Sequence, residues 1–475
     1  MTEPYENPQS ANDVRAYALA RMPKTIEKLK RYLTVPSISC EKGHGEDVRR
    51  LAAWVHKDLQ ALGLHSRLLE LGQAHPLVAA ELSASGDARP TVLLYGHLDV
   101  QPVINERWTT PPHEAHVRNG RLYARGAADD MGGWVSHMAA IEAWLSVRGS
   151  LPVNVKLIIE GEEEIGSPNL KRYMDAYPEA FLANLMVLTD GENPSDEIPG
   201  LTVSLRGVFK VEVSCESLEA DVHSGLWGNI APDPGNALVL LLSRLLDERG
   251  RMRLGRLDHP EPVRRILAQV PLRSGLIREA IRAVDGVVPL PLDGRSAAEW
   301  LWRQPAVTIL STTLPRPSDH KNAVRARAAA TLSIRLAPGQ TAPGMMDLLQ
   351  SELLADPPGG VKVSLRELPS GGQSWLCEPQ GDAFEAANRA YEASWGRPLY
   401  PIGLGGTIPL VSIFSERYPG VPLILNGVLD PMSGAHGPDE SLHLDVFAKT
   451  IAATVQLFDE LARVGSGPAG GAHHH

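Results

Sequence analysis

The sequence predicts an α/β protein whose main domain is a doubly wound, mostly parallel sheet, interrupted by a smaller α+β domain. In roughly the first 200 residues, apolar segments of strand length alternate with amphipathic segments of helix length. From about residue 201 the pattern changes to strict alternation of polar and apolar residues, and near residue 377 the first pattern returns. A chain of 475 residues also exceeds one ordinary hydrophobic core. We therefore expect a main domain at 1–202 and 377–465, an insertion at 203–376, and a tail with a tag remnant at 466–475.

The first part of the main domain begins with an amphipathic helix at 47–64, where apolar residues recur at three- and four-residue spacing. The segment "TVLLYGHLDV", residues 91–100, is an apolar strand that breaks at Gly96. The next predicted elements are a helix at 131–146, a strand at 152–160, a short helix at 167–177 and a strand at 184–192. Continuously apolar strands separated by helices indicate a sheet covered on both faces.

The insertion begins with residues 201–207 and 209–217, which alternate like half-buried antiparallel strands. A helix at 235–250 and a long irregular stretch follow. The later predicted elements are a strand at 326–339, a helix at 342–354 and a strand at 360–368. The α/β pattern then resumes with a helix at 382–395, a strand at 421–427 and a final helix from Asp445.

Composition excludes several classes of partner. The formal net charge is -10 and the sequence pI is about 5.9, which argues against binding nucleic acid or an anionic membrane. We see no apolar run of membrane-spanning length and no signal-peptide pattern, so a cytoplasmic protein is expected. Cys40, Cys215 and Cys377 lie too far apart to suggest a disulfide framework.

Polar side chains gather where predicted parallel strands end, the edge at which open α/β sheets build ligand sites. Singly, each has an ordinary structural explanation, such as a helix cap or a turn. Together, two histidines and several carboxylates at one edge would repel one another and resist burial unless divalent cations neutralised them. The residues concerned are His97, Asp99, Asp129, Asp130, Glu163, Glu164, Asp190 and His436.

This donor set predicts a metal centre. Mixed imidazole and carboxylate ligands suit zinc, with cobalt or manganese as alternatives. One bridging carboxylate, with one histidine and one carboxylate for each ion, makes a two-metal hydrolytic site. Asp99 stands two residues after His97 and can hold the second imidazole nitrogen of that ring.

Five motifs in order, "GHLDV", "RGAADD", "EGEEEIGS", "VLTDG" and "AHGPDE", resemble those of the dinuclear zinc peptidase and amidohydrolase family. That family includes carnosinases, cytosolic non-specific dipeptidases, carboxypeptidase G, succinyl-diaminopimelate desuccinylase and acetylornithine deacetylase. The resemblance extends from about residue 20 to 460. The segments "GRLYARGAADD", "LPVNVKLIIEGEEEIGS" and "DVHSGLWG" look most like the carnosinase-like dipeptidase branch.

The resemblance implies roles for individual residues. His97 and Asp190 would bind one metal, and Glu164 and His436 the other. Asp129 would bridge the two ions, with Asp130 as an alternative that spacing leaves open. Glu163 would be the general base: it would take a proton from water bridging the metals, and the resulting hydroxide would attack the amide carbonyl.

The resemblance also implies how substrate is held. His223 would stabilise the oxyanion, from the same chain or across a homodimer formed through the insertion. Arg335 would bind the free carboxylate of the substrate. The remaining residues implied in substrate binding are Gly405, Gly406 and Thr407 of a glycine-rich loop and Asn322 of a lid loop.

Two departures from the family pattern stand out. Met131 replaces the usual lysine after the aspartate pair, and Leu404 replaces a glutamate that can meet the free amine of a dipeptide. We therefore expect a metal-dependent hydrolase of dipeptides that reads the amine weakly or prefers an apolar first residue. The alternatives are an N-acyl-amino-acid deacylase or a related amidohydrolase and, from another class, an inactive metal- or peptide-binding protein. The presence of Glu163 and every expected ligand argues against inactivity.

Overall fold

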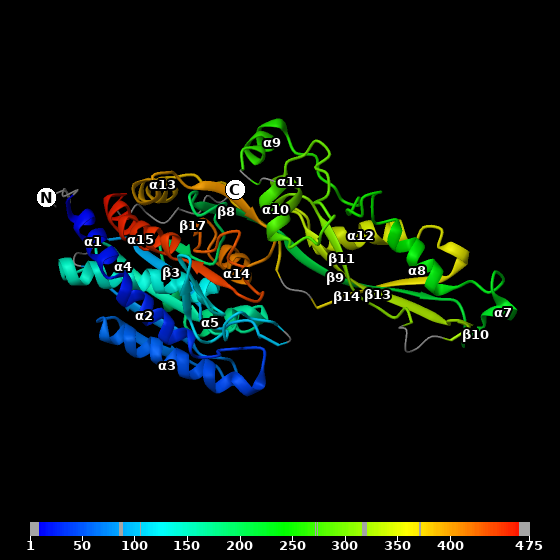
Figure 1. Cartoon of the computed structure of the whole chain (residues 1–475), viewed down its shortest axis with the longest axis horizontal. Coiled ribbons are helices and arrows are strands. Elements are labelled where there is room, and N and C mark those ends of the chain that lie inside the picture. Colours follow the sequence, from blue (N-terminus) through cyan, green and yellow to red (C-terminus); the bar gives the residue numbers. More distant parts are fainter. Residues whose placement is uncertain are drawn as a thin grey trace.

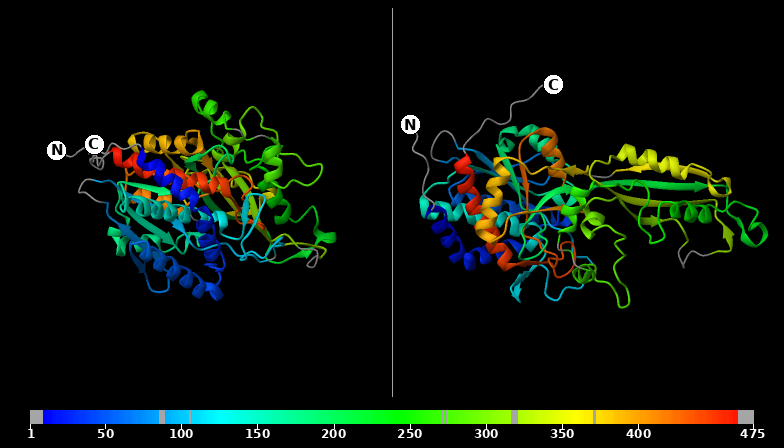
Figure 2. Two further views of the ribbon diagram at one scale, coloured as in Figure 1. Left: turned by 60° about the vertical axis from the view of Figure 1, so that its left-hand side comes forward. Right: turned by 90° about the horizontal axis from the view of Figure 1, so that it is seen from above.

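The computed structural model describes residues 9–84, 89–104, 106–270, 272, 274–315, 321–369 and 372–464, and the predicted tail at 466–475 lies outside them. The chain forms a rounded body and an elongated body that extends from it (Figures 1 and 2). The first and last described helices, at residues 9–20 and 444–464, belong to the rounded body, and the elongated body is built from the middle of the sequence. None of the helices in these ranges is long and apolar enough to cross a membrane.

A six-stranded sheet with the strand order β1-β2-β6-β3-β7-β17 forms the centre of the rounded body. Strand β3 runs parallel to β6 and β7, and β17 runs parallel to β7, whereas β1 and β2 pair antiparallel at one edge. The predicted doubly wound, mostly parallel sheet is therefore confirmed. The strands are β1 (His65–Leu69), β2 (Leu77–Leu82), β3 (Thr91–His97), β6 (Asn154–Glu160), β7 (Leu185–Leu188) and β17 (Leu423–Leu425).

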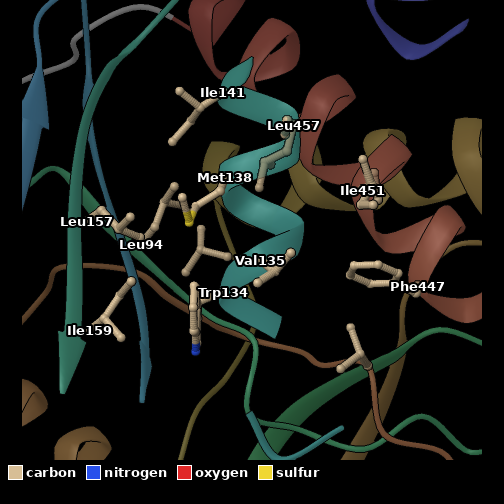
Figure 3. Packing of buried hydrophobic residues seen from close by; sticks show 14 of the residues in the cluster. Leu94, Trp134, Val135, Met138, Ile141, Leu157, Ile159, Phe447, Ile451 and Leu457 are labelled. Atoms are coloured by element: carbon tan, nitrogen blue, oxygen red, sulfur yellow. The ribbon is translucent and has the colours of Figure 1, made fainter. Parts of the chain in front are cut away.

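Helices cover both faces of this sheet because successive strand side chains point to opposite sides. Val92 and Leu94 belong to one buried cluster, and Leu93 and Tyr95 belong to another. Figure 3 shows Leu94 facing helix α4 at Met138. The first face carries α1 (Gln9–Ala20), α3 (Gly45–Ala61), α4 (Gly132–Arg148), α13 (Asp382–Trp395) and α15 (Leu444–Val464), and the second carries α5 (Leu170–Ala176) and α14 (Pro409–Arg417).

The elongated body is a four-stranded antiparallel sheet with the order β11-β13-β9-β14. Residues of β9 alternate between buried and partly exposed, as the sequence predicts for 209–217, and residues of β13 do the same. Helices α8 (Pro234–Ser243) and α12 (Ala342–Leu353) pack on the buried face. The strands are β9 (Gly207–Glu216), β11 (Ala306–Thr312), β13 (Arg327–Leu336) and β14 (Lys362–Leu368), all inside the proposed insertion at 203–376.

Two predictions are wrong: the half-buried antiparallel strand at 201–207 and the irregular stretch between 250 and 326. Strand β8 (Gly200–Leu205) is buried along its whole length, because its side chains belong to the two clusters of the rounded body. It pairs parallel with β16 (Tyr400–Leu404) and antiparallel with β15 (Trp375–Leu376). The stretch predicted to be irregular contains three short helices, α9 (Glu261–Ala268), α10 (Ser274–Ala280) and α11 (Ala297–Trp302).

The remaining elements are helix α2 and several short helices and strands. They are α2 (Met22–Leu33), β4 (His116–Arg118), β5 (Arg121–Tyr123), α6 (Pro178–Phe181), β10 (Val222–His223), α7 (Ser224–Trp227), β12 (Ala323–Val324) and β18 (Ser441–His443).

Candidate metal centre

Two groups of potential metal ligands meet at the edge where β3, β6 and β7 end. His97 is the last residue of β3, Glu163 and Glu164 follow β6, and Asp190 follows β7. The ligand atoms within each group lie within 4.8 Å of one another. One group consists of His97, Glu163 and Asp190, and the other consists of Asp129, Glu164 and His436.

Asp129 lies between the two histidines. Its Oδ1 is 3.1 Å from His97 Nε2, and its Oδ2 is 3.1 Å from His436 Nε2. Asp130 is directed elsewhere, since its fully buried carboxylate accepts a hydrogen bond from the His97 backbone N–H at 3.3 Å. Of the two adjacent aspartates that the sequence left open, only Asp129 reaches both histidines.

Asp99 supports both His97 and the glutamate turn. The shorter contact of His97 Nδ1 is to the Asp99 carbonyl oxygen at 3.0 Å, while the Asp99 carboxylate lies 3.6 Å from that nitrogen. The carboxylate itself accepts hydrogen bonds from the backbone N–H groups of Glu163 at 3.2 Å and Glu164 at 3.0 Å. One residue thus fixes the imidazole and the turn that carries the two glutamates.

The pKa values of several groups in this region are strongly shifted. Burial raises the pKa of the Glu163 and Asp190 carboxyls well above their usual range, and nearby carboxylates raise it further. Hydrogen bonds to Asp129 and Glu164 raise the pKa of His436 to about 11. Without metal, bound protons would offset the repulsion among these carboxylates, and divalent cations can replace those protons. The two imidazoles and four carboxylates fit two such ions.

Two residues that the sequence reasoning missed hold the ligand loops together. The buried Glu440 carboxylate accepts hydrogen bonds from the backbone N–H groups of Gly126 at 3.1 Å, Ala128 at 3.0 Å and Asp129 at 3.1 Å. Arg125 donates to Glu440 at 3.0 Å and to the Gly437 carbonyl at 3.2 Å. The pair connects the turn of Asp129 to the loop of His436. Arg125 lies in the motif "RGAADD" and Glu440 in "AHGPDE". Membership of these motifs was the only feature of the sequence that could have pointed to them.

A cavity of about 290 Å³ opens beside the donor groups. Gly406 and Thr407 of the predicted substrate loop line it together with Asp129, Glu163 and Asp190. The remaining loop residue, Gly405, accepts a hydrogen bond through its carbonyl from Arg206 Nε at 3.2 Å.

Arg206 and Arg335 lie close together beside the glycine-rich loop of residues 405–407. Burial, together with the neighbouring positive charge of Arg335, lowers the pKa of Arg206 to about 10. The Arg335 backbone pairs within the sheet, but its guanidinium makes no hydrogen bond or ion pair to any residue that the structure describes. Arg206, which the sequence reasoning also missed, therefore adds a second positive charge next to the predicted Arg335.

His223 and Asn322 lie together, away from the donor groups of their own chain. Strand β10, which includes His223, pairs with β12 directly after Asn322, and the Ser224 N–H donates to the Asn322 carbonyl at 3.1 Å. Figure 1 shows β10 at the far end of the elongated body, opposite the body that contains β3.

Comparisons with known proteins identify the family of the chain. Residues 93–460 match the sequence profile of peptidase family M20/M25/M40. The chain is 32% identical over 403 residues to a cysteinylglycine-S-conjugate dipeptidase of Corynebacterium striatum, covering 84% of this chain and 87% of that protein.

Two solved structures share the fold over nearly their full length. Human carnosine dipeptidase 1 has a TM-score of 0.79 at 25% identity, covering 96% of this chain and 100% of the other. A metallo-carboxypeptidase of Sulfolobus solfataricus has a TM-score of 0.76 at 26% identity, covering 93% and 99%.

Proposed function

The chain belongs to peptidase family M20/M25/M40 and is a metallopeptidase, and from its site we propose that it hydrolyses dipeptides with two divalent cations. The observation that carries this proposal is the position of Asp129, within 3.1 Å of imidazole nitrogens from both donor groups. His97 and Asp190 would hold one ion, Glu164 and His436 the other, and Asp129 would reach both. Zinc suits these ligands, with manganese or cobalt as alternatives.

The cations would supply a water molecule with a lowered pKa. Glu163 lines the cavity beside His97 and Asp190, so it can take a proton from that water and return it to the leaving amine. Burial keeps the pKa of Glu163 high, which suits a side chain that must both accept and release a proton.

The free carboxylate of the substrate would bind between Arg335, Arg206 and the loop of Gly405, Gly406 and Thr407. Guanidinium groups pair with carboxylates through two parallel hydrogen bonds, and Arg335 has none committed within the described ranges. His223 and Asn322 would reach the cavity from the partner subunit of a homodimer. Dimerisation through the insertion and a cytoplasmic location remain predictions from the sequence.

The proposal is tested by assaying metal-stripped protein against a dipeptide panel, with zinc, manganese or cobalt restored in turn. We expect turnover only after metal is restored. Glu163→Gln should lower kcat by about 100-fold or more while the bound metal is unchanged, because general-base catalysis contributes at least that factor. Full activity of the stripped protein, or of Glu163→Gln, would contradict the proposal.

A second candidate is hydrolysis of N-acyl amino acids, which carry no ammonium group. The observation that favours it is Leu404, whose apolar side chain lines the cavity where a charged partner for an amine could have stood.

A further inference from the structure

The cavity contains one acidic side chain, Glu192, that neither donor group includes. It stands two residues after Asp190, and its backbone pairs with Leu429, which fixes it at the cavity wall. The Glu192 side chain is exposed and makes no hydrogen bond or ion pair to any residue that the structure describes. The nearby Asp430 is different, since Arg121 pairs with it at 2.9 Å.

Position sets Glu192 apart from the other acids of the cavity. Asp129, Glu163 and Asp190 line the same cavity but belong to the two donor groups. Glu192 belongs to neither group, so its carboxylate would face the substrate without a partner of opposite charge. A substrate with a cationic group at this position would supply the missing partner.

The wall next to Glu192 is apolar. Leu404, Ile408 and Leu429 line the same cavity. The positive charges of Arg206 and Arg335 lie elsewhere, beside the glycine loop. The site thus offers a negative charge, an apolar wall and a separate positive region, which matches a dipeptide with an ammonium group, an apolar first side chain and a free carboxylate.

We infer that Glu192 binds the free ammonium group of the substrate, and that Leu404, Ile408 and Leu429 hold its first side chain. This inference rests on the proposed function and narrows its substrate to dipeptides with a free amine and an apolar first residue. An N-acyl amino acid would leave Glu192 unpaired against an apolar wall, which is unfavourable.

The test compares Leu-Gly with N-acetyl-Leu-Gly, which share the same scissile bond, in the zinc-loaded enzyme. Wild type should prefer Leu-Gly by about 10-fold or more in kcat/KM, the size expected for a hydrogen bond between charged groups. Glu192→Gln keeps the size of the side chain and should raise KM for Leu-Gly about 10-fold, with N-acetyl-Leu-Gly unaffected. Bound zinc should not change.

A rescue variant makes the assignment specific. Because residues 192 and 404 line the same cavity, the double variant Glu192→Gln with Leu404→Glu should regain preference for the free amine. An unchanged preference in Glu192→Gln, or a loss of zinc from it, would overturn the inference. So would a wild-type preference for N-acetyl-Leu-Gly. Turnover of neither substrate, nor of any other in the panel, would contradict the proposed function and this inference together.

Discussion

At the residue scale, the candidate metal centre depends on side chains that hold its ligands as well as on the ligands themselves. Asp99 accepts hydrogen bonds from the backbone of Glu163 and Glu164, and Glu440 accepts one from the backbone of Asp129. These buried carboxylates orient the turns that present the ligands, so metal affinity should depend on them.

Glu440→Gln is the direct test of this support. Gln has one acceptor oxygen in place of two, so at least one of the backbone N–H groups of residues 126–129 loses its partner. We expect zinc affinity to fall about 10- to 100-fold, the range measured for such supporting groups. Glu106→Gln is the matched control, since Glu106 also pairs with Arg125, at 3.0 Å, but touches no ligand backbone. Equal losses in both variants would contradict this role for Glu440.

Metal binding should release protons. Hydrogen bonds to Asp129 and Glu164 raise the pKa of His436 to about 11, so its imidazole is protonated in the metal-free protein at neutral pH. A metal ligand must be neutral imidazole, so this proton leaves when metal binds, and zinc affinity should rise with pH between about 6 and 8. Calorimetry in two buffers of different ionisation enthalpy measures the release directly. Identical heats in both buffers would argue against it.

The sequence could identify the ligands because each follows an apolar strand, and strand ends share one edge of the sheet. It could not identify Glu440 as the partner of the Asp129 turn, because the two are 311 positions apart. Nor could it decide between Asp129 and Asp130, since adjacent side chains differ in direction and not in spacing. Arg206 and Glu192 were missed because their significance comes from the cavity and the loop beside them.

At the element scale, the close contact between β3 and α4 positions His97. A Cβ added to Gly96 would lie 2.6 Å from Asp130 Oδ2 and 2.7 Å from Trp134 Cβ, so only glycine fits. The sequence predicted a break at Gly96, but the strand continues to His97. Gly96 is therefore required by its contact with the helix.

Gly96→Ala should lower the free energy of unfolding by about 1–3 kcal/mol, because overpacking forces β3 and α4 apart. Gly43→Ala is the control, since no atom lies within 4 Å of its added Cβ. Thermal denaturation of both variants measures the effect. Equal midpoints for Gly96→Ala and wild type would show that the interface can adjust.

Helices and strands with a strong hydrophobic pattern were predicted well, and those without such a pattern were not. The apolar runs of β3 and β6 and the amphipathic helix α13 lie where the sequence predicts them. The burial of β8 depends on β16, which lies almost 200 residues further along the chain. Helices α9 to α11 have no more than eight residues each, too few to establish a helical period.

At the scale of the whole molecule, the chain places its metal centre in one body and His223 at the distant end of the other (Figure 1). Within a single chain the two do not meet. A homodimer in which each insertion reaches the cavity of its partner would complete both sites, as the sequence resemblance implies.

Mixed dimers test this arrangement. Glu163→Gln and His223→Ala should each be nearly inactive alone. When the two are co-expressed, one site of each mixed dimer regains an intact Glu163 and an intact His223. Random pairing should restore about a quarter of the wild-type sites. Recovery near that level supports action across the dimer, and no recovery would place His223 in its own chain or outside the reaction.

The two donor groups around Asp129 are proposed to hold two divalent cations. Anomalous X-ray diffraction from crystals of the zinc-loaded protein, recorded on both sides of the zinc absorption edge, tests it most directly. We predict two zinc peaks in each chain, one beside His97 and Asp190 and one beside Glu164 and His436, with Asp129 contacting both. A single peak, or peaks away from these residues, would contradict a two-cation centre.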